Sequence, residues 1–367
     1  MDNAEPRLYL GSDAMKAAAL VLAAVISTLA SCASQIGYLA KQGDYLLRYS
    51  SGTQSVDDLM ASPSTPPATR NFLLRIREIK GYAVQQVGLR DNANYTRYKS
   101  IDRDYLVEVV SACDASSFTP YQWSFPFLGR LPYKGFYEHS DAQAEAERLT
   151  KEGYDVIVRK VDAFSTLGFT KDPVYSFMSK YSPYELASTI IHEQTHATLW
   201  VKGQTDFNEE LADFVGETGA LGWIGERFGP QSAEYQAALD ERADSELFVA
   251  DLKELARSLG EVYDSPIPRA WKLERKVRIL DAFRKKLADD SGTLFHTPGY
   301  RKIGKLPLNN AYLSLYALYT DDIPLLRSYY EKGCGSDLRA FMQTAEKLAK
   351  TGDVKAQMRA RLESSAH

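Results

Sequence analysis

The pattern His192-Glu193-Gln194-Thr195-His196 constrains this chain more than any other feature. An α-helix turns about 100° per residue, so histidines four positions apart lie on one face, one turn from each other. Their imidazole rings can hold a single metal ion, while Glu193 projects to the side of that ion. The pattern therefore predicts a metal-binding helix. The alternative is a helix whose histidines are merely packed or solvated.

A third ligand is expected from the next helix. Gly203 is a natural C-cap for the first helix, and Glu209 follows within the stretch 208–213, Asn-Glu-Glu-Leu-Ala-Asp. Asp213 lies one helical turn beyond Glu209 on the same face, where it can accept the free N–H of a ligating histidine. Glu210 points about 100° away from Glu209, so we rank it well behind as a ligand.

Three protein ligands leave one position for water, which is the arrangement of a catalytic zinc site. Zinc lowers the pKa of that water, Glu193 would accept its proton while the hydroxide attacks a scissile carbonyl, and the proton would then pass to the leaving amine. The sequence thus predicts a zinc peptide hydrolase with one Zn²⁺ on His192, His196 and Glu209. Leu199 and Lys202 stand where a metzincin has its Gly and third His, which excludes that class. Two alternatives stay open: a non-catalytic envelope binding or scaffold protein with a structural or vestigial metal site, and a zinc hydrolase of non-peptide amides.

Peptide hydrolysis also needs a partner for the developing oxyanion. Tyr133, Tyr137 and His139 are candidates, and we choose Tyr137; the alternative is aromatic packing. An exopeptidase must in addition hold a free α-amine. Glu217 and Glu210 are candidates for that role, with plain surface charges as the alternative.

The N-terminal segment has the features of an export signal. Lys16 is followed by an apolar run, 17–26, that is too short for a bilayer span, which needs about 20 residues. The sequence 29–32, Leu-Ala-Ser-Cys, is similar to a bacterial lipobox. We expect residues 1–31 to be a signal peptide and Cys32 to carry a lipid that anchors the protein to the bilayer of the cell envelope. The alternative is a buried helix that ends in Cys. Met15 is a second candidate for the start of translation.

Composition bounds the remaining possibilities. The 367 residues are 44% apolar, with a formal net charge of −4, and no basic stripe indicates nucleic-acid binding.

The spacing of hydrophobic residues and the positions of Gly and Pro predict a helix-rich α+β fold with a zincin-like core. We expect a tether and helix over 32–66, the catalytic core over 67–230, and a helical C-terminal region, 231–367, packed on it. The expected elements are helices over 67–87, from 140 to 153, from 183 to about 202 and from about 207, and strands over 105–110 and 154–161. A structured loop is expected over 123–137. Cys113 and Cys334 are expected to be unpaired.

Several stretches are similar to those of one family: 78–83, 88–92, 123–126, 133–137, 153–156, 165–169, 192–209 and 308–311. Through them the chain resembles the Aminopep family of bacterial aminopeptidases. The resemblance implies a gluzincin-type peptidase exported as a lipoprotein, with His192, His196 and Glu209 on zinc and Glu193 catalytic. Family members often carry Cys at the positions of Ser124 and Arg130, and position 213 often differs.

Overall fold

The computed structural model of the chain describes residues 37–38, 41–45, 47–48, 51–125, 129–161, 172–300, 306–316 and 322–364. The expected signal segment and Cys32 lie outside these ranges. Within them the chain is a helix-rich α+β protein, which confirms the predicted fold class. No helix in this part of the chain is both long and apolar enough to cross a membrane.

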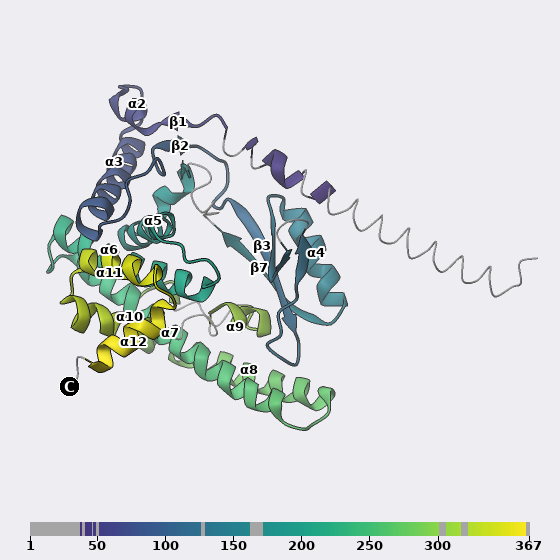
Figure 1. The fold of residues 1–367 in the computed structure, drawn as a ribbon. Coiled ribbons are helices and arrows are strands. Elements are labelled where there is room, and N and C mark those ends of the chain that lie inside the picture. Colours follow the sequence, from purple (N-terminus) through teal and green to yellow (C-terminus); the bar gives the residue numbers. More distant parts are fainter. Residues whose placement is uncertain are drawn as a thin grey trace, which may run out of the picture.

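The main sheet has three antiparallel strands. β3 (Val107–Asp114) lies in the centre, between β6 (Tyr133–Phe136) and β7 (Tyr154–Val161). β3 is buried along almost its whole length because both faces of the sheet are covered. Helix α4 (His139–Lys151) packs against one face, where Val110 and Phe136 contribute to a cluster that includes Leu149. The opposite face is turned toward the central helices (Figure 1).

Two further small sheets complete the strands. The first contains β1 (Gln54–Ser55), β2 (Arg97–Lys99) and β8 (Val174–Tyr175). The second is a hairpin of β4 (Trp123–Phe125) and β5 (Gly129–Leu131). The prediction of a loop over 123–137 was therefore wrong in part, since β4, β5 and β6 lie within it. Strands of only three or four residues leave no clear period in the sequence.

The central helices are α5 (Pro183–Thr198) and α6 (Thr205–Phe228), and their mutual packing is the largest contact between elements of the described chain. Their apolar faces share one buried cluster with α3 (Pro67–Tyr82), which continues into a π-helical turn, Ala83–Val87. These helices begin where the sequence predicts. However, α5 ends at Thr198, four residues before the expected end, with Leu199 as its extended C-cap.

The remaining helices follow in chain order: α2 (Val56–Ala61), α7 (Ala233–Asp264), α8 (Arg269–Leu294), α9 (Asn310–Tyr316), α10 (Ile323–Ser328), α11 (Leu338–Ala349) and α12 (Val354–Ser364). Side chains of α10–α12 enter the same buried cluster as α5 and α6, whereas α7, α8 and α9 form a second one. The expected helical C-terminal half is confirmed, while the proposed boundary at residue 230 stays a prediction. Cys113 and Cys334 are free, as predicted.

Candidate metal centre

Helix α5 carries both histidines on a well-defined frame. The Ser182 hydroxyl accepts the backbone N–H of Glu185 at 3.0 Å, and Pro183 occupies the first turn, so the start of the helix is fixed. His196 is 5% exposed, whereas His192 is half-buried. Both rings therefore have restricted freedom before any ligand binds.

Helix α6 approaches α5 closely because glycine faces it. A Cβ atom at Gly216 would lie 2.9 Å from the backbone oxygen of Ser188 and 3.2 Å from Cβ of His192. Only a residue without a side chain allows this separation. Gly216 was not predicted from the sequence. The sequence feature that could have indicated Gly216 is its position one turn after Asp213, on the side of α6 that faces the histidines.

Asn208 fixes the connection between the two helices. It is 1% exposed, and its side chain accepts the N–H of Val201 at 2.8 Å and donates to the carbonyl of Val201 at 2.9 Å. This pair of hydrogen bonds sets the position at which α6 begins, and therefore the position of Glu209. From the sequence, Asn208 was only part of a motif.

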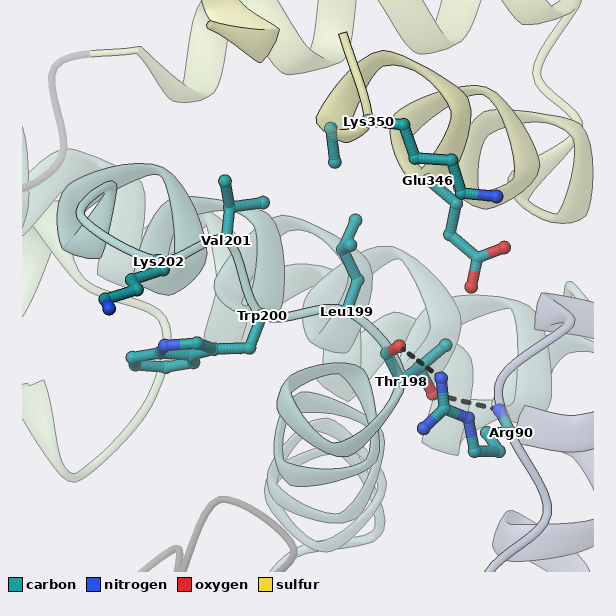
Figure 2. Close-up of a pocket in the computed structure, with 9 residues that line it drawn as sticks. Arg90, Thr198, Leu199, Trp200, Val201, Lys202, Glu346 and Lys350 are labelled. Carbon is teal, nitrogen blue, oxygen red and sulfur yellow. Dashed lines mark hydrogen bonds between the residues drawn. The ribbon is translucent and has the colours of Figure 1, made fainter. Parts of the chain in front are cut away.

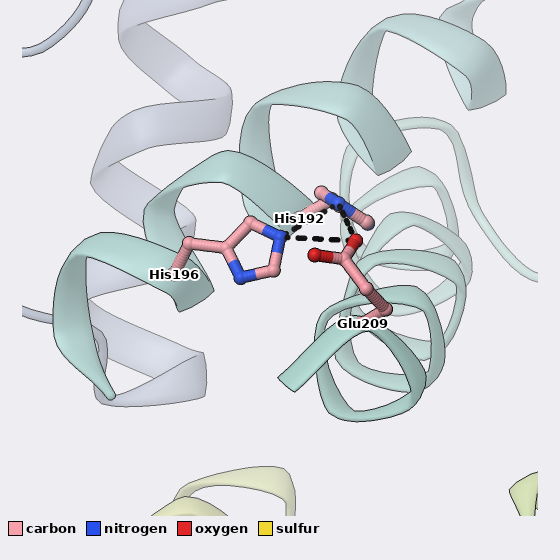
Figure 3. Close-up of side chains that lie close together, drawn as sticks. All are labelled: His192, His196 and Glu209. Atoms are coloured by element: carbon pink, nitrogen blue, oxygen red, sulfur yellow. Dashed lines mark hydrogen bonds and ion pairs between the residues drawn. The ribbon is translucent and has the colours of Figure 1, made fainter. Parts of the chain in front are cut away.

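The three predicted ligands come together at the meeting point of α5 and α6 (Figure 3). Nε2 of His192 lies 3.1 Å from Nε2 of His196, and Oε2 of Glu209 lies 3.9 Å and 3.5 Å from these two nitrogens. The point equidistant from the corners of such a triangle is about 2 Å from each, which matches Zn–N and Zn–O bonds of about 2.0–2.2 Å. Two imidazoles and one carboxylate are also a donor set that suits zinc.

Asp213 lies behind the first of these histidines. Its Oδ1 is 2.9 Å from Nδ1 of His192, which leaves Nε2 of that ring directed at the ligand triangle. Burial by itself lowers the pKa of His192, but the hydrogen bond and the charge of Asp213 outweigh burial, and the pKa rises to about 9. Burial likewise raises the pKa of Glu209, yet His196 and His192 overcome it, and the net shift is downward. The cluster therefore stabilises the charged form of His192 and the charged form of Glu209.

Glu193 stands beside the triangle with a free oxygen. Its Oε2 is buried and has no hydrogen-bond partner among the described residues, and the same is true of Nδ1 of His196. The pKa of Tyr95 is raised, mainly by burial and then by the charge of Glu193, which places that phenol nearby. A buried carboxylate oxygen without a partner is costly unless a ligand or water satisfies it.

The three candidates for the oxyanion partner, Tyr133, Tyr137 and His139, lie in different surroundings. Tyr137 is 7% exposed, and its ring stacks on that of Tyr45 at 5.6 Å, which is the packing alternative. His139 is engaged by Glu108, whose carboxylate lies 3.0 Å from Nδ1. Tyr133 on β6 is 39% exposed, and its pKa is raised by burial and then by the charge of Glu209. The electrostatic surroundings of Tyr133 therefore include a predicted metal ligand.

The two acidic candidates are not plain surface charges. Glu210 is 2% exposed; it accepts the backbone N–H of Asp322 at 3.2 Å and the ammonium group of Lys355 at 2.8 Å. It therefore ties α6 to the C-terminal helices. Glu217 is partly buried, and burial followed by the charge of Asp213 raises its pKa to about 7.

A pocket with a volume of about 420 Å³ opens beyond the C-terminal end of α5 (Figure 2). It is lined by residues 198–202 together with Arg90, Glu346, Ala349 and Lys350. The indole ring of Trp200 lies edge-on to the ring of His196, with their centroids 5.4 Å apart. Trp200 therefore contacts both the pocket and the metal centre.

Comparison with known proteins agrees with the resemblance seen in the sequence. No curated protein and no solved structure matches the chain. A family model described as "Putative aminopeptidase" matches residues 37–361, which include every strand and nearly all helices described above. The chain therefore belongs to the Aminopep family.

Proposed function

We propose that this protein is a zinc-dependent peptide hydrolase that acts as an aminopeptidase. The observation that carries the proposal is the triangle of His192, His196 and Glu209, whose dimensions suit one zinc ion, with the unpartnered carboxylate of Glu193 beside it. Zinc in such a site supplies Lewis acidity and lowers the pKa of water. A structural site has no use for a free carboxylate at this position, which argues against the scaffold alternative.

Glu193 is the general base in this proposal. Its buried Oε2 takes a proton from the attacking water and later delivers that proton to the departing amine nitrogen. Asp213 orients His192 through Nδ1 and holds the tautomer in which Nε2 is free to ligate. The reaction then needs a donor for the oxygen of the tetrahedral intermediate.

We assign that donor to Tyr133 in place of Tyr137. Tyr137 is enclosed by the stacked ring of Tyr45 and by core side chains. The phenol of Tyr133 remains partly exposed and lies within the electrostatic range of Glu209. A phenol is protonated at neutral pH, so the Tyr133 hydroxyl can donate a hydrogen bond.

The location of the protein is part of the proposal. We infer from residues 15–32 that the chain is exported, lipidated on Cys32 and held at the bilayer of the cell envelope. Expression in a bacterial host with a labelled fatty acid tests this inference. The wild-type protein should carry the label and begin at residue 32, whereas Cys32→Ser should remain unlabelled.

The activity is tested by digesting a defined peptide library and reading the products by mass spectrometry. We expect release of single N-terminal residues, loss of this activity with a chelator, and its return on addition of zinc. Glu193→Gln should bind zinc normally and lose at least 1000-fold in kcat. A zinc-loaded wild-type protein that cleaves no peptide, or a Glu193→Gln variant of full activity, would contradict the proposal.

A further inference from the structure

The sheet face that looks toward the metal helices carries a polar group that the proposed mechanism does not use. Cross-strand partners share one face of a sheet. The register joins Gly135, Val109 and Arg159 in one row across the three strands. Val109 belongs to the buried cluster that includes Ile191 of α5 and Leu211 of α6. Arg159 therefore lies on the face opposite to α4, since Val156 and Val158 of the same strand pack on the α4 side.

Among the residues that the structure describes, none accepts a hydrogen bond from the guanidinium group of Arg159. The residue is half-buried, its Nε atom is buried, and it makes no hydrogen bond or ion pair with any residue in the described ranges. On the same strand, the charge of Asp155 is matched by Lys276 and by the N–H of Asn310. Leaving a buried donor unsatisfied is costly, so the buried Nε–H of Arg159 is available to an external acceptor.

A second polar group lies in the adjacent row. Ser111 pairs with Tyr133 on one side and with Ile157 on the other, so its hydroxyl is on the same face as Arg159. Ser111 is 4% exposed, and its Oγ has no partner among the described residues. Gly135, directly across the sheet from Arg159, adds no side chain to this face.

Tyr133 connects this polar patch to the metal centre. Its pKa is raised by burial and by Glu209 and lowered by Arg159, so the phenol is within electrostatic range of both groups. Arg159 and Glu209 therefore both act electrostatically on the phenol of Tyr133.

We propose that Arg159, assisted by Ser111, binds the C-terminal carboxylate of the substrate, so that the enzyme prefers short peptides with a free C-terminus. This inference rests on the proposed peptidase function. A guanidinium group pairs with a carboxylate through two parallel hydrogen bonds, a geometry that lysine cannot reproduce. Every unmodified peptide has this group at its C-terminal end, and only a short peptide brings it close to the scissile bond.

The test compares trialanine with its C-terminal amide on the zinc-loaded protein. We expect kcat/KM to be at least 10-fold higher for the free acid. In Arg159→Gln this preference should disappear, mainly through a higher KM for the acid. Arg159→Lys should retain part of the preference, and a thermal melt of each variant checks the fold.

Lys160→Gln is the matched control. Lys160 is the next residue on β7, and its substitution by Gln removes the same charge. Its side chain lies on the other face of the sheet, because its register partner on β3 is Glu108 and its ammonium group lies 4.7 Å from the centre of the Tyr105 ring. Its substitution should leave the preference for the acid unchanged. Equal rates for acid and amide in the wild type, or equal losses for both in Arg159→Gln, would overturn the carboxylate subsite and leave the peptidase function standing.

A binding measurement tests the carboxylate subsite independently of the peptidase function. Calorimetry with zinc-loaded Glu193→Gln should show at least 10-fold tighter binding of trialanine than of its amide. The added substitution Arg159→Gln should abolish that difference. Selective binding without any hydrolysis by the wild type would support the subsite and contradict the peptidase function, whereas binding without selectivity would overturn the subsite.

Discussion

The carboxylate of Asp213 lies 2.9 Å from Nδ1 of His192, one helical turn after Glu209 on α6. Helix α6 therefore contributes twice to the candidate metal centre: Glu209 is a proposed ligand, and Asp213 orients His192, the proposed ligand on α5. This arrangement makes the centre sensitive to the distance between α5 and α6. Substitutions on α6 and in the charges around the centre should therefore alter metal affinity or stability.

Asp213→Asn should weaken zinc binding by about 10–100-fold, because the amide orients His192 less firmly and adds no negative charge. A competition titration with a chromogenic chelator measures the change. Asp206→Asn is the control, since Asp206 is an exposed residue in the first turn of the same helix. Equal affinities for the Asp213 variant and the wild type would show that the contact does not support the metal.

Gly216→Ala should destabilise the fold by about 1–3 kcal/mol and weaken zinc binding, because the added methyl group pushes α6 away from Ser188 and His192. Urea unfolding and zinc titration report the two effects. Gly260→Ala on α7 is the control, since a Cβ there meets nothing within 4 Å and alanine favours a helix. A Gly216 variant as stable as this control would refute the close-packing argument.

Glu217 should make the protein less stable as the pH rises. Its pKa is about 7 in the fold and 4.5 in the unfolded chain, so between these values the unfolded chain loses a proton that the folded chain retains. Stability from this group is full below pH 4.5 and declines up to about pH 7, by roughly 1–3 kcal/mol. Glu217→Gln should therefore match the wild type near pH 4.5 and exceed it at pH 8 in urea unfolding. The same difference at both pH values would contradict the shifted pKa.

Ser124→Cys with Arg130→Cys should form a disulfide bond under oxidising conditions. The two residues face each other across the β4–β5 hairpin. Closing this short loop should raise stability by about 2 kcal/mol. The measurements are the mass of the oxidised protein and its melting temperature with and without reductant. Free thiols after oxidation would show that the hairpin register is different.

The convergence of His192, His196 and Glu209 could be predicted from the sequence because their geometry is local. His192 and His196 share one helix, and Glu209 follows after a short loop, so helical spacing alone brings them into range. Arg159 could not be found in this way, since the face it occupies depends on the register with β3 and its lack of a partner depends on the whole fold. The role of Glu210 in tying α6 to the C-terminal helices could not be predicted either, because its partners, Asp322 and Lys355, lie more than 100 residues away.

The most direct test of the account is the zinc stoichiometry and K-edge X-ray absorption of the metal-reconstituted protein. We expect one zinc ion per chain, bound by two imidazole rings and oxygen donors at about 2.0–2.2 Å, with no sulfur ligand. Glu209→Ala should remove one oxygen donor and reduce the affinity. Absence of stoichiometric zinc, or a spectrum unchanged by Glu209→Ala, would contradict the assignment of His192, His196 and Glu209 as the metal centre.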